Sequence, residues 1–322
     1  MKGLIWLTWR QHRWPIVISA AITVGLTVYM LITARQLADM ADKCGAACEQ
    51  SPLGPTPSHA TYAMNTVVFL PVLVAVFWGV PLLAREYEQR TLPLAWSQDV
   101  SRHRWLFGKA AIMMALVGAM GTALAGAAAY LAREFHAYTG ASLFDGSAYA
   151  AAGWLPLTMA LAWLAFGIAA GAATRRTMPA LAVVAAAWFG SQIALMPRLR
   201  PHFMAPVTGA LPLNAPSNIM DLTQTGANTV YVDGHGNRYT MDQLMEKCTT
   251  ALSAHQARGT RIVISSPTCE QKLGVAQLST YQPAGRLGAF HAIDNGINLG
   301  LLAAALLVAW WCVHRTRTTT SA

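Results

Sequence analysis

Six stretches of predominantly apolar residues, each about 20 residues long, constrain the fold of this chain more than any other feature of its sequence. A helix needs about 20 such residues to cross the roughly 30 Å hydrocarbon core of a membrane, and shorter runs are ambiguous. The stretches lie at 15–33, 64–84, 110–132, 150–174, 177–196 and 292–314. They predict an all-α polytopic membrane protein with six transmembrane helices.

The composition supports a membrane protein. Hydrophobic residues make up 54% of the chain and charged residues only 11%, which lies outside the usual range for a soluble globular protein. The first stretch also raises the alternative of a cleaved signal peptide. Its apolar run is long, it lacks a convincing small-residue cleavage site and a Trp-rich basic segment precedes it, so we expect a retained helix.

The positions of Lys and Arg in the short loops predict the orientation, because cytoplasmic loops carry an excess of these residues. The loops on one side, including both ends of the chain, carry Lys2, Arg10, Arg13, Arg85, Arg90, Arg102, Arg104, Lys109, Arg175, Arg176, Arg315 and Arg317. The opposite short loops carry Arg35, Lys43 and Arg133. Both termini are therefore expected to be cytoplasmic.

The cysteines divide between the two sides under this orientation. The predicted extracellular segments contain four of them, namely Cys44, Cys48, Cys248 and Cys269. Two local disulfides, Cys44 to Cys48 and Cys248 to Cys269, are the simplest pairing, although four cysteines allow three connectivities. A metal site built on C-x3-C is the rival interpretation, but no close pair of His residues completes it. We expect no metal, and we expect Cys312 to be a buried apolar side chain.

The segment 197–291 differs in composition from the spans, since it is polar and contains many Pro and Gly residues. The stretch TVYVDGHGNRYTM at 229–241 alternates apolar and polar residues around a Gly-rich turn, which predicts a β-hairpin. A helical pattern follows in YTMDQLMEKCTTALSAHQA. The segment is therefore expected to be a small extracellular α+β cap between the fifth and sixth helices.

The segment 85–109 is long and charged for a connection between two spans. One interpretation places its aromatic residues in the membrane interface as anchors and its basic residues against anionic lipid headgroups. Glu86 and Glu88 do nothing for anionic lipid, however, whereas acidic residues interleaved with Arg suit docking to another protein.

The sequence PLLAREYEQRTLPLAWSQDVSRHRWLFGK, at 81–109, resembles the cytoplasmic segment of ABC-type exporter permeases, the type-two membrane subunits common in actinobacteria. The family pattern has Glu-x-Glu-x-Gly-Thr, then Leu-x-x-x-Trp-x-Gln, then Arg-x-x-Trp and a Lys before the third span. The matching positions here are Glu86, Glu88, Thr91, Leu92, Trp96, Gln98, Arg102, Arg104, Trp105 and Lys109. Arg90 departs from the pattern, because the family usually has Gly there.

The opening MKGLIWLTWRQHR is similar to the amphipathic entry helix of those permeases, and YQPAGRLGAFHAIDNGI to their approach to the last span. The first segment is apolar early and basic late, as an interfacial helix is. Its anchor and coupling roles are assigned to Trp6, Trp9, Arg10 and Arg13. The chain is therefore expected to consist of an entry helix at 1–14, five spans at 15–196 that include the cytoplasmic coupling segment 85–109, the cap at 197–291, and the last span with a tail at 292–322.

The resemblance implies a homodimer of permease subunits in a bacterial plasma membrane, with one ATPase subunit docked to each. ATP and Mg would be bound by that partner, since this chain has no G-x-x-x-x-G-K-[ST] loop and no cofactor of its own is expected. The ATPase contacts would be made by Glu86, Glu88, Arg90, Trp96, Gln98, Arg102, Arg104 and Trp105. We expect no binding of nucleic acid, because the net charge of +9 follows largely from the cytoplasmic loops and the segment 197–291.

Cargo is suggested only by composition, since spans with so few charges favour an amphipathic or hydrophobic lipid, peptide or drug. Two glycines, Gly167 and Gly171, form a GxxxG pattern that suits helix packing either within one subunit or between two. Asp294 is the carboxylate near a span, at the outer end of the sixth, where an interfacial location or stabilisation of a helix N-terminus explains it, and a proton relay through it is a minor alternative. A membrane enzyme is disfavoured because no H-E-x-x-H motif or paired intramembrane carboxylates occur. A non-transporting sensor or scaffold that binds a ligand through the segment 197–291 remains the alternative.

Overall fold

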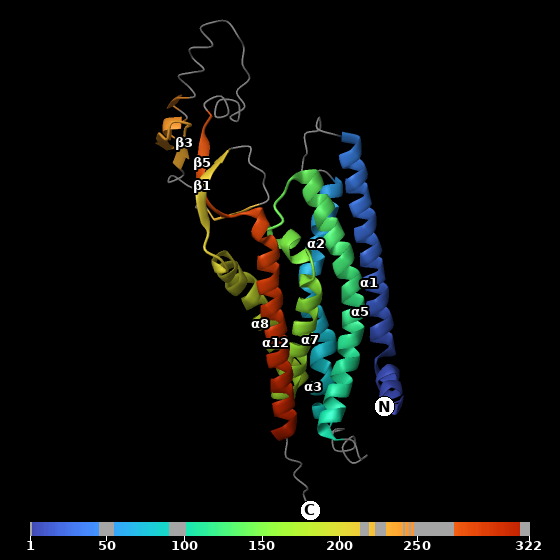
Figure 1. Cartoon of the computed structure of the whole chain (residues 1–322). Coiled ribbons are helices and arrows are strands. Elements are labelled where there is room, and N and C mark those ends of the chain that lie inside the picture. Colours follow the sequence, from blue (N-terminus) through green and yellow to red (C-terminus); the bar gives the residue numbers. More distant parts are fainter. Residues whose placement is uncertain are drawn as a thin grey trace, which may run out of the picture. The chain divides into compact units, whose positions relative to one another are not determined.

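The computed structural model describes residues 2–44, 55–89, 101–212, 219–222, 230–240, 242–244, 246–247 and 274–315. Within these residues the chain forms two compact units, Met1–Arg198 together with Gly288–Ala322, and Leu199–Leu287. The first unit is helical and the second contains a β-sheet (Figure 1). Each unit is described separately.

Among the residues that the structure describes, six helical segments are long and apolar enough to cross a membrane, which confirms the predicted number of spans. They are Ile16–Lys43, Pro55–Glu88, Arg104–Thr139, Leu155–Thr174, Thr177–His202 and Ala284–Arg315. Several extend well beyond the predicted limits, because a helix continues past its apolar run wherever no residue ends it. The helix α5 (Arg102–Thr139) is an example, since it begins at the N-cap Ser101 and ends at Gly140, which has a φ of 69°.

The first helix, α1 (Lys2–Cys44), is continuous. The predicted entry segment at 1–14 and the first span therefore share one helix, with no break in the backbone at their expected boundary. Pro15 stands at this boundary, and the helix continues through it, because membrane helices tolerate proline. The side chains of Trp6, Trp9, Arg10 and Arg13 lie outside the described part of the structure.

The second span consists of three consecutive segments, α2 (Pro55–Val74), the π-helical η2 (Ala75–Gly79) and α3 (Val80–Glu88). The start of α2 at a proline is favourable, because the first turn of a helix does not use that backbone N–H. The π-helical turn contains one more residue than an α-helical turn and is commonly found at functional sites. The span thus changes its helical register once, between Ala75 and Gly79.

The remaining elements of this unit are α6 (Gly146–Ala151), α7 (Leu155–Thr174), α8 (Thr177–Gly190), η3 (Ser191–Leu195) and α9 (Met196–Leu199), followed late in the chain by α12 (Leu287–Arg315). The helix α7 is the most buried span and packs against α2, η2, α3 and α5. The start of α1, the end of α3, the start of α5 and the end of α12 lie at one end of the bundle, here called the Glu86 end (Figure 1).

Two hydrophobic clusters stabilise the bundle. One joins α3, α5, α7 and α12 toward the Glu86 end and includes Leu83, Leu106, Leu164, Ile168 and Ala309. The other joins α1, α2, α5 and α6 toward the opposite end and includes Met30, Leu37, Met64, Ala128 and Leu131. Each cluster holds side chains from spans that are far apart in the sequence.

The second unit contains the strands β1 (Val207–Pro212), β2 (Met220–Asp221), β3 (Val230–Val232), β4 (Arg238–Thr240) and β5 (Ala276–Gln282). Their order is β1-β5-β3-β4, with β2 also paired to β5, and all pairs are antiparallel. The predicted hairpin at 229–241 is present as β3 and β4, with Val230 opposite Thr240. Residues 242–244 and 246–247 are helical, in the region where a helix is predicted.

The turn of this hairpin is organised by Asp233. Its carboxylate accepts hydrogen bonds from the backbone N–H of His235 and Asn237, from the Asn237 side chain and from the Tyr239 hydroxyl, each at 2.9 Å. These donors, the Asn237 side chain foremost, hold the pKa of Asp233 well below its usual range. Gly236 follows with a φ of 84°, a conformation that favours glycine.

Candidate functional site

The Glu86 end of the bundle contains an ion pair between two spans. Glu86, near the end of α3, accepts a hydrogen bond from the ammonium group of Lys109 in the first turns of α5. The Lys109 side chain is only 5% exposed and that of Glu86 is 20% exposed. A charge as buried as Lys109 is costly without a partner, so Glu86 is required to neutralise it.

Lys109 has a second favourable contact. Its Nζ lies 4.7 Å from the ring centroid of Trp105, one turn earlier on the same helix, which is the geometry of a cation–π interaction. Trp105 is itself buried in the cluster of α3, α5 and α7. The second carboxylate oxygen of Glu86, Oε2, has no hydrogen-bond partner among the residues that the structure describes.

Glu88 connects the end of the second span to the start of the fifth. Its Oε1 accepts a hydrogen bond from the backbone N–H of Thr177 at 2.8 Å, and its Oε2 accepts one from the Thr177 hydroxyl at 2.8 Å. Thr177 is the first residue of α8. The N-terminus of a helix has unpaired N–H groups and a partial positive charge, so the carboxylate acts as a cap supplied by another span.

The residue between the two glutamates makes a third contact. The guanidinium carbon of Arg175 lies 5.7 Å from the ring centroid of Tyr87. Arg175 ends α7 with a φ of 56°, a left-handed conformation that lets the chain reverse into α8 within two residues. The tripeptide Glu86-Tyr87-Glu88 therefore contacts the start of the third span and the connection between the fourth and fifth.

The predicted ATPase-contacting residues are distributed as follows. Glu86 and Glu88 both have partners within the chain, Trp105 is buried, and Arg104 is exposed. Arg102 begins α5, but its side chain, like all of Arg90, Trp96 and Gln98, lies outside the described residues. Contact with an ATPase stays a prediction for the whole set.

Sequence reasoning missed Tyr87, Arg175 and Thr177 as members of this site, and it used Lys109 only as a loop charge and as a match to the family pattern. The sequence did contain a signal for Lys109, because a single Lys at the start of an apolar run predicts that a carboxylate from another segment neutralises it. No local pattern connects Glu88 to Thr177, since the two are 89 residues apart.

At the opposite end of the bundle, polar side chains join α12 to α6 and α7. The Tyr149 hydroxyl donates to Asp294 Oδ2 at 2.8 Å, and the Thr158 hydroxyl lies 2.6 Å from Asn295 Oδ1. Asp294 is only 3% exposed. Of the two explanations predicted for Asp294, stabilisation of a helix N-terminus is wrong, because α12 starts at Leu287 and Asp294 lies about two turns inside it. An interfacial location stays a prediction.

The GxxxG pattern is used inside the subunit. A Cβ placed on Gly167 would lie 2.6 Å from the carbonyl oxygen of Ala75, and one placed on Gly171 would lie 2.7 Å from that of Val80. Gly79, on the facing helix, approaches the Leu164 carbonyl oxygen in the same way. The second and fourth spans therefore touch backbone to backbone along η2 and the start of α3.

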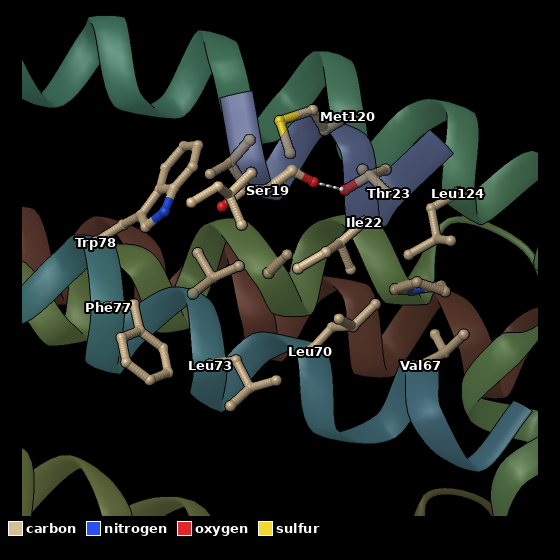
Figure 2. Close-up of a pocket in the computed structure, with 16 residues that line it drawn as sticks. Ser19, Ile22, Thr23, Val67, Leu70, Leu73, Phe77, Trp78, Met120 and Leu124 are labelled. Carbon is tan, nitrogen blue, oxygen red and sulfur yellow. Dashed lines mark hydrogen bonds between the residues drawn. The ribbon is translucent and has the colours of Figure 1, made fainter. Parts of the chain in front are cut away.

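A cavity of about 410 Å³ lies among α1, α2, η2, α5 and α7, between the two hydrophobic clusters (Figure 2). Its lining residues come from 18–23, 67–78, 117–124 and 156–160, all within the candidate spans. Side chains such as Leu70, Trp78, Met120 and Leu124 form its walls. Among the residues that the structure describes, no three His, Cys, Asp or Glu side chains gather in a way that would hold a metal ion.

The two predicted disulfides, Cys44 to Cys48 and Cys248 to Cys269, stay predictions. Cys48, Cys248 and Cys269, together with the side chain of Cys44, lie outside the described part of the structure. Cys312 is described, and its thiol in α12 is half-buried.

Comparison with protein families gives one relationship. Residues 20–200 match the model of a family described as ABC-2 membrane transporter related. This region contains the second, third and fourth spans, most of the first and fifth, and both sides of the Glu86 site. A search of curated proteins finds none that matches the chain.

Proposed function

The chain belongs to the ABC-2 membrane transporter related family, and on that premise we propose that it is the permease subunit of an ATP-driven exporter. It is a multi-pass membrane protein and a transport component, and this family normally works with an ATPase partner. In the proposed assembly, two copies of this chain associate in a bacterial plasma membrane, and each docks a separate ATPase subunit that binds ATP and Mg. The Glu86 end would face the cytoplasm, as would both termini.

The observation that carries the proposal is the set of contacts made by Glu86-Tyr87-Glu88. This tripeptide belongs to the segment 85–109, which is expected to dock the ATPase and couple it to the spans. It is bonded to α5 through Lys109 and to α8 through Thr177. A displacement of the docking segment would therefore reach the second, third and fifth spans together, rather than one helix end alone.

The close approach of the second and fourth spans extends this connection. At Gly79, Gly167 and Gly171 the nearest atoms of the facing helix are backbone atoms, so no flexible side chain separates α7 from the second span at these three points. Close-packed interiors transmit strain because they have little free volume. We therefore infer that the second, third, fourth and fifth spans respond as a group when the ATPases close.

The cargo is proposed to be amphipathic or hydrophobic. Support comes from the apolar composition of the spans and from the apolar lining of the described cavity. Few charges are available within the spans to bind an ion or a sugar.

The test is co-purification with the ATPase encoded beside this chain, followed by measurement of ATP hydrolysis in liposomes with and without the permease. The variant is Arg104→Glu, because Arg104 is exposed at the Glu86 end of α5. The control is Arg133→Glu, since Arg133 is an exposed arginine near the other end of the same helix.

We expect Arg104→Glu to weaken recovery of the ATPase and Arg133→Glu to leave it unchanged. Recovery reduced equally by both variants would contradict docking at the Glu86 end. If no ATPase is retained by the wild-type chain under any condition, the exporter proposal is wrong, and ligand binding by the segment 197–291 becomes the function to test.

A further inference from the structure

The walls of the cavity offer few polar contacts. Of its lining residues, Ser19, Thr23 and Trp78 are the ones with a polar side-chain atom. The Thr23 hydroxyl donates to the Ser19 carbonyl oxygen at 2.8 Å, so its hydrogen is already used within α1 (Figure 2). A buried water needs two to four polar partners, and apolar cavities remain dry. Water is therefore a poor occupant for this space.

The cavity opens between α1 and the second span. The side chains along this opening are large, apolar and exposed: Ile18 is 56% exposed, Ile22 61%, Leu73 46% and Phe77 68%. Farther from the Glu86 end the same two helices are closed against each other, and Met30 and Ala60 are fully buried there. Because the opening lies within the spans, the medium in front of it in a membrane is hydrocarbon.

The dimensions suit one long aliphatic chain. Along α2 and η2 the lining runs from Val67 to Trp78, a length of about 16 Å at the usual helical rise. This is about half of the roughly 30 Å hydrocarbon core, which is the depth that the acyl chains of one leaflet fill. The volume lies within the usual range of small-molecule sites, about 300–1,000 Å³.

We propose that this cavity is a lipid site, which binds one acyl chain of a membrane lipid that enters sideways from the bilayer between α1 and α2. If the cavity were empty, its lining atoms would lack dispersion contacts, and an acyl chain supplies them without bringing polar groups that need partners. The π-helical turn η2 contributes Phe77 and Trp78 to the site. The proposal goes beyond transport, because it depends only on the membrane location of the spans.

The test uses nanodiscs of phosphatidylglycerol that contain a small fraction of the same lipid with a photoreactive diazirine on one acyl chain. After illumination, labelled peptides are identified by mass spectrometry, and native mass spectrometry counts the lipids retained by each chain. Thr23→Trp fills the cavity from α1, and Val24→Trp places the same indole on the neighbouring residue, which is 62% exposed and does not line the cavity. For the wild type and Val24→Trp we expect labelling of 67–78 and 117–124 and one retained lipid.

Labelling of these peptides should fall about tenfold in Thr23→Trp, because a tryptophan side chain occupies much of the space that the acyl chain would take. A second pair guards against misfolding of the first: Met120→Trp fills the cavity from α5, and Ala119→Trp is its exposed neighbour. Equal labelling of Met120→Trp and Ala119→Trp would show that only lipids on the outer surface are detected and would overturn the proposal. Failure of transport in any assay would leave this result unaffected.

Discussion

Replacing Gly167 with alanine tests the backbone contact between the second and fourth spans. The added Cβ would lie 2.6 Å from the Ala75 carbonyl oxygen and 3.1 Å from the Gly79 Cα, whereas ordinary van der Waals contact begins at 3.4 Å. Both neighbours are backbone atoms, so neither can turn aside as a flexible side chain would. The two spans must move apart to accommodate the methyl group.

The size of the effect follows from this geometry. Overpacking a close-packed interior costs about 1–3 kcal/mol, and the loss of helix–helix contact on either side of the glycine adds to that cost. Alanine also favours a helix over glycine by about 1 kcal/mol, which offsets part of the loss. We therefore expect Gly167→Ala to reduce stability by a net amount of about 1–2 kcal/mol.

The assay is unfolding of the purified protein in a fixed detergent, monitored by loss of the monodisperse peak in size-exclusion chromatography as temperature rises. Gly118→Ala is the matched control, because Gly118 also lies inside a span but a Cβ there meets nothing within 4 Å. The control should be neutral or slightly stabilising. Equal midpoints for the two variants, or a more stable Gly167→Ala, would refute the close approach of the second and fourth spans.

Three further predictions concern charged groups. Glu86→Ala leaves the buried Lys109 unpaired and should destabilise the protein by about 3–5 kcal/mol. The double variant Glu86→Gln with Lys109→Met removes both charges and should restore most of the thermal midpoint. A double variant no more stable than Glu86→Ala would contradict the ion pair. Glu88→Gln should increase the rate of hydrogen exchange at the Thr177 amide and lower ATP-driven transport, while the amount of protein in the membrane stays unchanged. An unaltered exchange rate would contradict capping of α8 by the Glu88 carboxylate. Asp233→Asn should destabilise the hairpin at pH 7, because the hydrogen bonds to the Asp233 carboxylate lower its pKa in the folded state. The carboxylate therefore stabilises the hairpin at any pH above its unfolded pKa of about 3.9, and this stabilisation is lost as the pH falls toward the folded pKa. Hydrogen-exchange rates of 231–239, corrected for intrinsic rates, should thus differ between wild type and variant at pH 7 and become equal in strong acid. A difference that grows on acidification would contradict a lowered pKa of Asp233 in the folded state.

The features that sequence predicts well are local in the chain. Each span must be apolar over its own length, so six spans can be counted from the sequence, and the described part of the chain contains six candidate spans. The β3–β4 hairpin is also local, because its strands flank the Gly-rich turn that joins them. Patterns of this kind need no knowledge of what lies beside them in space.

The features that sequence could not supply depend on distant partners. The strand β1 contains Gly209 and Pro212, which weaken a strand prediction, and its partner β5 is more than sixty residues away. Glu88 and Thr177 are separated by two spans. Sequence reasoning identified Glu86 and Glu88 as functional candidates from their resemblance to a family pattern, but their internal partners became visible only when α3, α5 and α8 were placed together.

The π-helical turn at Ala75–Gly79 has a consequence for rotation about the axis of the second span. Each residue in a helix advances by about 100° around the axis, so the surplus residue of η2 turns everything after it by that angle relative to a continuous α-helix. Glu86 faces Lys109, and Glu88 faces Thr177, in the phase that this turn produces. Deleting a single residue between Ala75 and Gly79 would preserve a long apolar span but point both carboxylates about a quarter of a turn away from their partners. The angular alignment of the charged end with its neighbouring helices therefore originates two to three turns deeper in the membrane, at a place that carries no charge.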